Sequence, residues 1–276
     1  MKTAKEFLKR NFIILAVAAV LTLTAVSVAV VNGTLDTAHT YVGAAIIPNV
    51  FGLTGFTGGN GFIWCSGTLV APRVFLTAAH CLQPFGQPLT NYVSLDQVLV
   101  TFDATNISPP PADAIHVSSI AIMPGYEFTK MNTPDPSDVG VIILAKSVRN
   151  ITPARLAPIG FLDAFPALNK VTVSLVGYGL NEQLVLTGNR LIGTANFVNL
   201  NDTWFKYSPG TCTADDGGPT LALDGPTEYQ IGLHSSGTSN TGQGTTVDGC
   251  TPSGYDTRVD TVVVQSFIQQ QIAANP

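Results

Sequence analysis

The sequence predicts an all-β fold of two barrel-like halves closed by one C-terminal helix. Many short apolar runs are broken by Gly, Pro, Asn and Thr, with 26 Gly and 18 Pro among 276 residues, a pattern typical of β-sandwiches and barrels. Helical periodicity is confined to residues 261–272. Its apolar stripe comprises Val263, Val264, Phe267 and Ile268. A polar connection with two prolines, at about residues 146–160, separates the two halves.

Each half is expected to contain several short strands. In the first half these are residues 41–47, 62–70, 97–102, 114–122 and 139–144, the last being a fully apolar run suited to a buried strand. In the second half they are residues 171–179, 190–198, 219–223 and 229–233. No sequence repeat is present, so we expect one domain over residues 30–276, with halves at about 30–145 and 161–276.

The N-terminus predicts an export signal. It begins with a basic segment, continues with an apolar run at residues 12–23 and ends with the small residues Ser27-Val28-Ala29. This is the order of segments in a cleavable signal peptide. Cleavage after Ala29 would make residues 1–29 a signal peptide, and the loss of four bases and one acid would change the net charge from −5 to −8. The alternative is a retained anchor, because residues 12–31 match the ~20 residues that span a bilayer.

The charge balance argues against a nucleic-acid partner, since 13 Lys and Arg stand against 18 Asp and Glu with no basic stripe after the leader. Four cysteines follow the leader: Cys65, Cys81, Cys212 and Cys250. An even set in an exported chain predicts disulfides, with three possible pairings. No spacing resembles a CxxC zinc motif, so no metal site is expected.

Three separated stretches carry residues suited to nucleophilic acyl transfer. His80 directly precedes a cysteine, Asp138 opens the apolar run at residues 139–144, and two aspartates lie in the Gly-rich stretch CTADDGGP. In such chemistry an aspartate fixes the tautomer of a histidine, the histidine accepts a proton, and a tight turn presents a nucleophile and N–H donors. Asp138 could instead cap a turn, and Asp135 is a second candidate for the partner of His80.

At these stretches the sequence resembles the trypsin and chymotrypsin family of secreted serine proteases. TAAHC (residues 77–81) matches the family's catalytic-histidine motif, SDVGVIIL resembles the segment with the catalytic aspartate, and CTADDGGP resembles C-x-G-D-S-G-G-P. VGYG, LHSSG and GYDTRV are further similar stretches, and the resemblance spans about residues 30–273. It implies two six-stranded antiparallel β-barrels with a C-terminal helix, peptide-bond hydrolysis, and no cofactor.

The resemblance also implies two disulfides, Cys65–Cys81 and Cys212–Cys250, each stabilising a loop beside the site. It further implies a mature N-terminus at Val30, whose ammonium group inserts beside Asp215. Cleavage after Ala29 would expose Val30 directly, so signal removal alone could form this ion pair.

The sequence departs from the family at the nucleophile, where Asp216 stands in place of serine. A carboxylate is already ionised and weakly nucleophilic, whereas a serine hydroxyl is activated when imidazole removes its proton. Its charge lies where the oxyanion must form, and it favours the imidazolium form of His80. Ala214 replaces a family glycine whose N–H, with that of residue 216, forms the oxyanion hole; the added β-carbon is expected to tilt this donor.

These departures predict a pseudoprotease, a secreted protease homologue that binds a peptide or protein in the old substrate cleft. The alternative is a serine-type endopeptidase with residual or unconventional activity. We expect a monomer that contacts a membrane only if the leader is retained.

By resemblance, the primary specificity pocket has its base near Gly210. Its walls are formed by Ser235, Ser236, Gly237 and Gly254. No acid occupies the base, so a preference for Arg or Lys is not predicted, and the direction of Asp256 is open. Ser235 matches a family serine that hydrogen-bonds the catalytic aspartate, which disfavours Ser235 or Ser236 as a substitute nucleophile.

The other histidines, His39, His116 and His234, are expected at the surface or in loops. N-x-S/T sequons begin at Asn32, Asn106, Asn150 and Asn201, and they are glycosylation sites only in an organism that glycosylates them.

Overall fold

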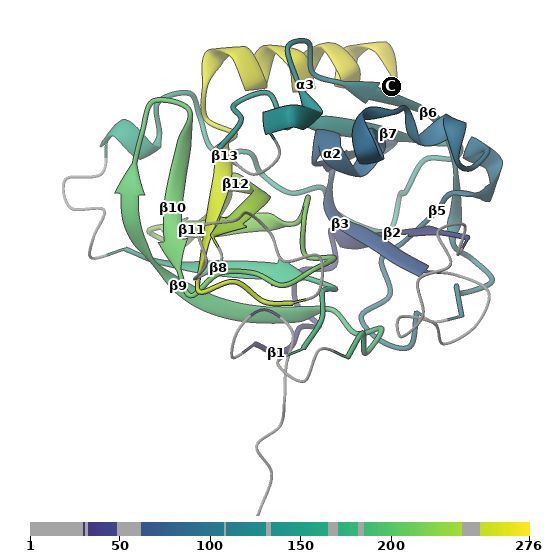
Figure 1. Ribbon diagram of the computed structural model, residues 1–276, viewed down its shortest axis with the longest axis horizontal. Coiled ribbons are helices and arrows are strands. Elements are labelled where there is room, and N and C mark those ends of the chain that lie inside the picture. Colours follow the sequence, from purple (N-terminus) through teal and green to yellow (C-terminus); the bar gives the residue numbers. More distant parts are fainter. Residues whose placement is uncertain are drawn as a thin grey trace, which may run out of the picture.

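The computed structural model describes residues 30, 33–48, 62–107, 109–130, 134–164, 171–181, 185–238 and 249–276. These residues form two closed, six-stranded antiparallel β-barrels and a C-terminal helix (Figure 1). The predicted all-β class and double-barrel architecture are confirmed.

The first barrel is closed in the order β2-β3-β4-β7-β6-β5. Its strands are β2 (Val42–Ile47), β3 (Phe62–Ala71), β4 (Val74–Thr77), β5 (Leu99–Thr101), β6 (Ile115–Ile122) and β7 (Gly140–Leu144). Every residue of β2, β4 and β7 is buried, which explains why these segments are continuous apolar runs rather than alternating ones.

The second barrel is closed in the order β9-β10-β13-β12-β11-β8, with β8 paired to β9. Its strands are β8 (Thr172–Gly177), β9 (Leu191–Leu200), β10 (Trp204–Ser208), β11 (Pro219–Asp224), β12 (Thr227–Thr238) and β13 (Ser253–Arg258). The short strand β1 (Thr34–Leu35) pairs antiparallel with Leu191 and Ile192 at the start of β9. Much of β9 alternates between buried and exposed residues, as expected for a strand with one face on the core.

Strands β1, β4, β10 and β13 were not among the predicted strands. β4 is only four residues long and follows β3 directly after Pro72 and Arg73, and the predicted strand at residues 62–70 did not include it. The remaining helical elements are short. They are α2 (Ala79–Leu82) and the 3-10 turns η1 (Pro84–Gly86), η2 (Leu89–Asn91), η3 (Leu95–Gln97), η4 (Phe128–Lys130) and η5 (Leu162–Ala164).

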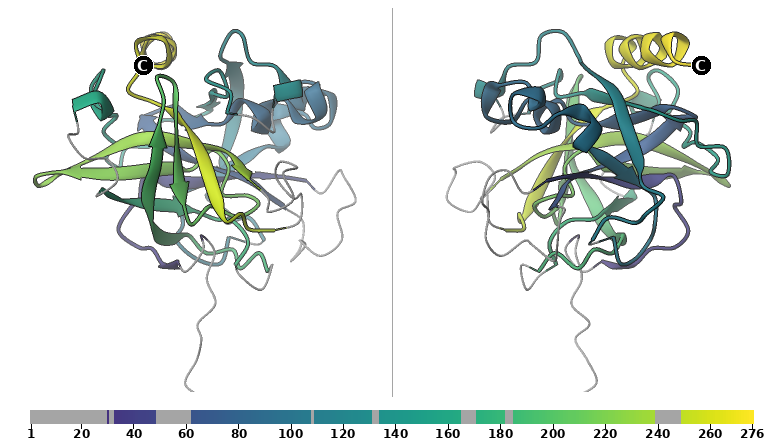
Figure 2. Two further views of the ribbon diagram at one scale, coloured as in Figure 1. Left: turned by 60° about the vertical axis from the view of Figure 1, so that its left-hand side comes forward. Right: turned by 90° about the vertical axis from the view of Figure 1, so that its right-hand side faces the viewer.

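The C-terminal helix α3 (Val262–Ala274) links the end of the chain to the first barrel. It begins at Thr261, whose side chain accepts a hydrogen bond from the Val264 N–H at 3.3 Å. Val264, Phe267 and Ile268 pack in one apolar cluster with residues of β4 and β7. Figures 1 and 2 show α3 along one edge of the molecule. Val263 is 65% exposed, so the other three residues of the predicted apolar stripe form the packed face and Val263 does not.

The connection at about residues 146–160 contacts both barrels. Ala154 N–H donates to the Leu69 carbonyl in the first barrel, and Ala157 N–H donates to the Gln230 carbonyl in the second. The two barrels are therefore joined by ordered backbone as well as by side-chain packing. Among the described residues, no helix is long and apolar enough to cross a membrane.

Candidate active site

The three stretches singled out in the sequence meet where the two barrels face each other. His80 lies on α2, which follows β4, and Asp138 lies just before β7, so both come from the first barrel. The stretch CTADDGGP lies between β10 and β11 of the second barrel. It reaches the first barrel directly, because Ser66 N–H of β3 donates to the Asp216 carbonyl at 2.9 Å.

His80 and Asp138 form a tightly oriented pair. The His80 Nδ1 lies 2.9 Å from Asp138 Oδ2, and the His80 backbone N–H donates to Asp138 Oδ1 at 2.9 Å. Ser235 Oγ also donates to Asp138 Oδ2, at 2.6 Å. Three donors thus fix the Asp138 carboxylate, which in turn fixes the ring of His80.

The alternative partner, Asp135, is not directed at His80. Its Oδ1 accepts the Ser137 N–H at 2.8 Å, closing the turn that leads to Asp138. The structure therefore places Asp138, and not Asp135, at the histidine.

Asp216 lies on the opposite side of the ring, with its Oδ2 3.7 Å from His80 Nε2. Its side chain is 24% exposed, against 11% for His80 and 3% for Asp138. The imidazole is consequently held between two carboxylates, one buried and one facing solvent.

The two carboxylates determine the charge of the ring. Burial lowers the pKa of His80, but the charge and hydrogen bond of Asp138, followed by those of Asp216, raise it well above 6.5. Burial raises the pKa of Asp138, and His80 together with the Ser235 hydroxyl brings it below 3.8. At neutral pH the structure favours an imidazolium between two carboxylates.

The turn that carries Asp216 has an unusual backbone. Ala214 adopts a φ of +75° and Gly217 a φ of +81°, a region that L-residues with a β-carbon disfavour. A Cβ at Gly217 would lie 2.1 Å from Thr77 Oγ1, so a glycine is required there. Within the described part of the chain, the N–H groups of Ala214 and Asp216 donate no hydrogen bond.

Both disulfides lie beside this site. They join Cys65 to Cys81 and Cys212 to Cys250, the pairing that the resemblance implied. Cys65 Sγ, Cys81 Sγ and a ring nitrogen of His80 lie within 4.8 Å of one another. Because the two sulfur atoms are bonded to each other, they offer no thiolate to a metal ion.

Asp215 is fully buried and points away from His80. Its carboxylate accepts the Gly179 N–H at 2.8 Å and the Cys212 N–H at 2.9 Å. Burial raises the pKa of Asp215 to about 6, against the effect of these two donors. Val30 is buried in the core of the second barrel. No hydrogen bond joins Val30 to Asp215 among the described residues, so their ion pair stays a prediction for a chain cleaved after Ala29.

The residues of the predicted specificity pocket lie on neighbouring segments. Gly237 of β12 pairs with Gly254 of β13, and Gly210 N–H donates to the Thr251 carbonyl just before β13. The side chain of Ser236 lies outside the described residues. A Cβ at Gly254 would lie 2.3 Å from the Tyr207 hydroxyl, so Tyr207 of β10 occupies the space beside this wall.

The expectation of a surface or loop position was wrong for one of the remaining histidines, His234. His234 is completely buried on β12, whereas His39 lies half-buried in the loop between β1 and β2 and His116 is exposed, both as expected. His234 was missed because its partner, Asp256, is 22 residues away and meets it only through the β12–β13 pairing. The apolar run that directly precedes His234 was the available signal that this residue continues a buried strand.

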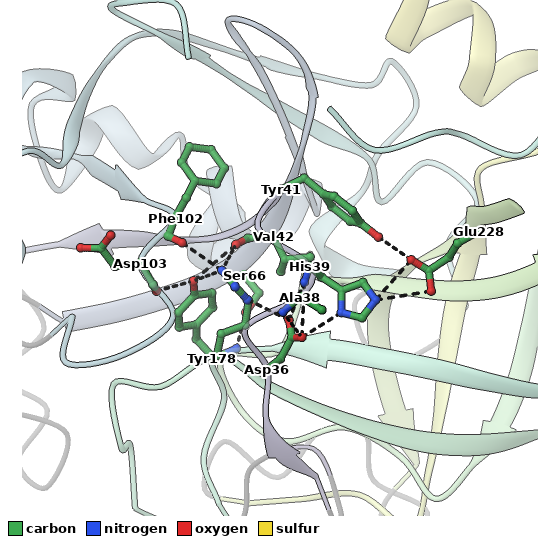
Figure 3. A network of polar contacts seen from close by, with 11 residues as sticks. Asp36, Ala38, His39, Tyr41, Val42, Ser66, Phe102, Asp103, Tyr178 and Glu228 are labelled. Carbon is green, nitrogen blue, oxygen red and sulfur yellow. Dashed lines mark hydrogen bonds and ion pairs between the residues drawn. The ribbon is translucent and has the colours of Figure 1, made fainter. Parts of the chain in front are cut away.

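His39 belongs to a polar network that anchors the segment before β2 to the rest of the molecule (Figure 3). Its Nδ1 lies 2.9 Å from Asp36 Oδ1, and its Nε2 lies 3.2 Å from Glu228 Oε2 at the start of β12. Asp36 also binds the buried guanidinium of Arg190, with Nε donating to Oδ2 at 2.9 Å.

The network continues towards the candidate site. Arg190 lies 3.2 Å from the Tyr178 hydroxyl, and Tyr178 N–H donates to Ser66 Oγ at 2.9 Å. Ser66 Oγ in turn donates to the Ala214 carbonyl at 2.8 Å. A continuous set of buried hydrogen bonds therefore leads from the N-terminal segment to the turn that carries Asp216.

Comparison with known proteins agrees with this geometry. The family model described as trypsin matches residues 48–259. A chymotrypsin from Phaedon cochleariae is 28% identical over 195 residues, which are 63% of each chain. A trypsin-like protease from Streptomyces glaucescens is 24% identical over 210 residues, which are 69% of this chain and 67% of the relative. The fold, the disulfides and the matched span together place the chain in the trypsin family.

Proposed function

We propose that this chain is a secreted trypsin-family pseudoprotease, whose cleft binds a peptide or protein segment without hydrolysing it. One observation carries the proposal: the Asp216 carboxylate lies 3.7 Å from His80 Nε2, in the place where the family has a serine hydroxyl. The membership of the chain in a family of serine proteases rests on the match to the family model.

The chemistry of a carboxylate at this position opposes acyl transfer. Attack of Asp216 on an amide would give a mixed anhydride, which collapses back more readily than an ester. Its negative charge would also lie beside the amide oxygen that becomes an oxyanion, which raises the energy of the transition state. Asp138 and then Asp216 raise the pKa of His80, which favours the imidazolium form and weakens the ring as a general base.

Several other parts of the site support retention of the cleft. Asp138 is held by three donors, both disulfides are formed, and the Gly217 turn packs closely on Thr77 and Ser66. These features would position a peptide whether or not the reaction proceeds. These retained contacts therefore favour a cleft that still binds a peptide over a cleft that has lost its structure.

A second candidate function is endopeptidase activity with a residual or unconventional reaction. The observation in its favour is the preserved His80–Asp138 hydrogen bond, together with the N–H groups of Ala214 and Asp216, which donate to no residue that the structure describes. Such donors could still polarise a carbonyl oxygen, which would leave weak catalysis by a water molecule.

Export is part of the proposal. The basic and apolar leader with Ser27-Val28-Ala29 supports cleavage after Ala29, and two disulfides are typical of oxidising compartments. N-terminal sequencing of the mature protein tests this point. Val30 as the first residue supports both signal removal and the proposed ion pair with Asp215, and any other first residue contradicts the pair.

One experiment separates the two candidate functions. The wild-type protein is incubated with a peptide mixture, and mass spectrometry measures both new peptide termini and peptides retained by the immobilised protein. We expect retained peptides and no new termini. Cleavage that persists after removal of contaminating proteases by affinity chromatography would favour the endopeptidase.

The matched variants are Asp216→Ser and the double variant Asp216→Ser with Ala214→Gly. Restoration of hydrolysis in the double variant would show that the cleft is intact and that Asp216 and Ala214 block the reaction. No hydrolysis and no retained peptide in any of the three proteins would contradict a peptide-binding cleft.

A further inference from the structure

The candidate site holds more negative charge than positive charge. One imidazole, that of His80, lies between the carboxylates of Asp138 and Asp216, and within the described chain no lysine or arginine pairs with either acid. A protonated ring therefore leaves one negative charge uncompensated, and a neutral ring leaves two. The site attracts a cation whichever form the ring takes.

Asp216 is the carboxylate that such a cation can reach. Its side chain is 24% exposed, whereas that of Asp138 is 3% exposed and already accepts three hydrogen bonds. The Asp216 Oδ2 atom lies 3.7 Å from His80 Nε2, which is beyond the length of an ordinary hydrogen bond. No other described residue forms an ion pair with Asp216. Its carboxylate is thus left for a partner from outside the chain.

The neighbouring acid, Asp215, does not compete for the same cation. It is fully buried, and its carboxylate accepts the N–H groups of Gly179 and Cys212. The cation predicted for it is the Val30 ammonium of a cleaved chain. An external cation at this turn is therefore expected at Asp216.

The same turn offers hydrogen-bond donors beside this acceptor. The N–H groups of Ala214 and Asp216 donate to no residue that the structure describes, and the second belongs to the residue that carries the accessible carboxylate. Paired backbone N–H donors at an acyl-transfer site are suited to a carbonyl oxygen of the ligand. A ligand that pairs with both the donors and the carboxylate needs a cation and a carbonyl oxygen close together.

The N-terminal residue of a peptide has both groups. Its ammonium nitrogen and its carbonyl carbon are bonded to one Cα, so the cation and the acceptor oxygen are neighbours. A lysine side chain carries an ammonium without a carbonyl, an interior peptide bond carries a carbonyl without a charge, and a C-terminal carboxylate is repelled by Asp216. Hydrogen bonds between charged groups are about twice as strong as neutral ones, which favours the chain end over an interior amide.

We propose that Asp216 binds the α-ammonium group of a peptide's N-terminal residue, while the N–H groups of Ala214 and Asp216 bind the carbonyl oxygen of that residue. This assignment rests on the proposed function, because it names the ligand class of the same cleft. The aspartate that opposes acyl transfer is then also the residue that selects the ligand, and the cleft binds chain ends rather than interior segments.

The test compares two libraries of random octapeptide amides on the immobilised protein. One library has free N-termini, and the other is N-acetylated and carries one added C-terminal lysine, so that the two libraries have the same net charge. Mass spectrometry measures the fraction of each library that is retained. We expect retention to be about tenfold higher for free N-termini, since a hydrogen bond between charged groups exceeds a neutral one. Equal retention, or higher retention of acetylated peptides, overturns the inference and leaves peptide binding intact.

The decisive variant is Asp216→Asn, which keeps the size of the side chain and removes its charge. Circular dichroism with thermal unfolding verifies its fold. We expect the preference for free N-termini to disappear in this protein and to persist in Asp224→Asn, which removes an exposed acid at the end of β11 and changes the net charge equally. A preference that survives in Asp216→Asn would also overturn the inference.

Retention of neither library would contradict the proposed function. The inference is then decided by an NMR titration of the ¹⁵N-labelled histidines with glycinamide, which has an ammonium and a carbonyl, and with N-acetylglycinamide as the control. Because His80 Nε2 lies 3.7 Å from Asp216 Oδ2, we expect glycinamide alone to shift the His80 Nε2 resonance. An unchanged resonance, or an equal shift with both compounds, overturns the inference.

Discussion

At the scale of single residues, Asp216 changes what His80 can do. The ring lies between the carboxylates of Asp138 and Asp216, at 2.9 Å and 3.7 Å, and both raise its pKa. A hydroxyl at position 216 would hydrogen-bond to Nε2 without adding charge. An aspartate at position 216 thus favours the imidazolium form of His80, which supports the proposed loss of general-base chemistry.

The backbone conformation of Ala214 leads to a second prediction for a single residue. Its φ of +75° costs a residue with a β-carbon about 1–2 kcal/mol relative to glycine. We expect Ala214→Gly to raise the free energy of unfolding, by up to about 1 kcal/mol after the larger chain entropy of glycine is included. Urea denaturation of the oxidised protein measures the change.

The control is Ala222→Gly in β11, where φ is negative and the alanine side chain is buried. This variant is expected to be less stable than the wild type. If Ala214→Gly instead lowers the free energy of unfolding, the positive φ of Ala214 does not strain the turn.

At the scale of elements, the N-terminal segment is fixed by buried charges rather than by strand pairing. β1 contains only two residues, yet Asp36 directly after it binds Arg190, and Arg190 also donates to the carbonyls of Val42 and Phe102. These bonds connect both barrels to the segment that would follow the mature N-terminus (Figure 3).

This arrangement predicts a large effect of Asp36→Asn. Removal of one charge leaves Arg190, 1% exposed, without its counter-ion, and the expected loss is about 3–5 kcal/mol in the free energy of unfolding. Asp36→Asn combined with Arg190→Gln is expected to cost less than Asp36→Asn alone. Urea denaturation measures both variants.

Asp163→Asn is the matched control, because Asp163 binds the buried Arg258 from a position that is 64% exposed. Its expected cost is within about 1 kcal/mol. An equal cost for Asp36→Asn and Asp163→Asn would contradict the structural role of the Asp36–Arg190 pair.

Elements also show how far the sequence allowed prediction. The buried strands β2 and β7 are continuous apolar runs, so both were predicted nearly to the residue. Short motifs identified His80 and Asp138, and these two residues meet as predicted. β4 was missed because it is only four residues long and directly follows a turn at Pro72 and Arg73. The burial of His234 depends on a partner brought near only by the register of β12 and β13. Contacts set by strand register leave no local sequence pattern.

At the scale of the whole molecule, three histidines hold protons more tightly in the fold than in the unfolded chain. Burial lowers the pKa of His39, but Asp36 and Glu228 raise it to about 9. The pKa values of His80 and His234 are also raised. A raised histidine pKa stabilises the fold fully below the unfolded value of about 6.5, and this stabilisation is lost as pH rises through the folded pKa.

The free energy of unfolding is therefore expected to fall as pH rises from 6.5 to 9. In the uncleaved chain, where no Val30 ammonium faces it, Asp215 acts in the same direction at lower pH, because its pKa of about 6 makes the folded state retain a proton between about pH 4 and 6. Urea denaturation at pH 6.5 and pH 9 tests the sign. The His39→Gln variant is expected to lose less stability over this interval, and a wild-type protein that becomes more stable towards pH 9 would contradict the prediction.

For the site as a whole, we propose a trypsin-family cleft that retains its binding geometry and has lost acyl transfer at Asp216. Labelling with a serine-directed fluorophosphonate tests it most directly, because the reagent reacts with the activated hydroxyl of a serine protease. Mass spectrometry of the labelled protein identifies the modified residue. We expect no labelling of the wild type and labelling at position 216 in the Asp216→Ser, Ala214→Gly protein. Labelling of the wild type, at Ser235, Ser236 or any other serine, would contradict the proposed loss of acyl transfer.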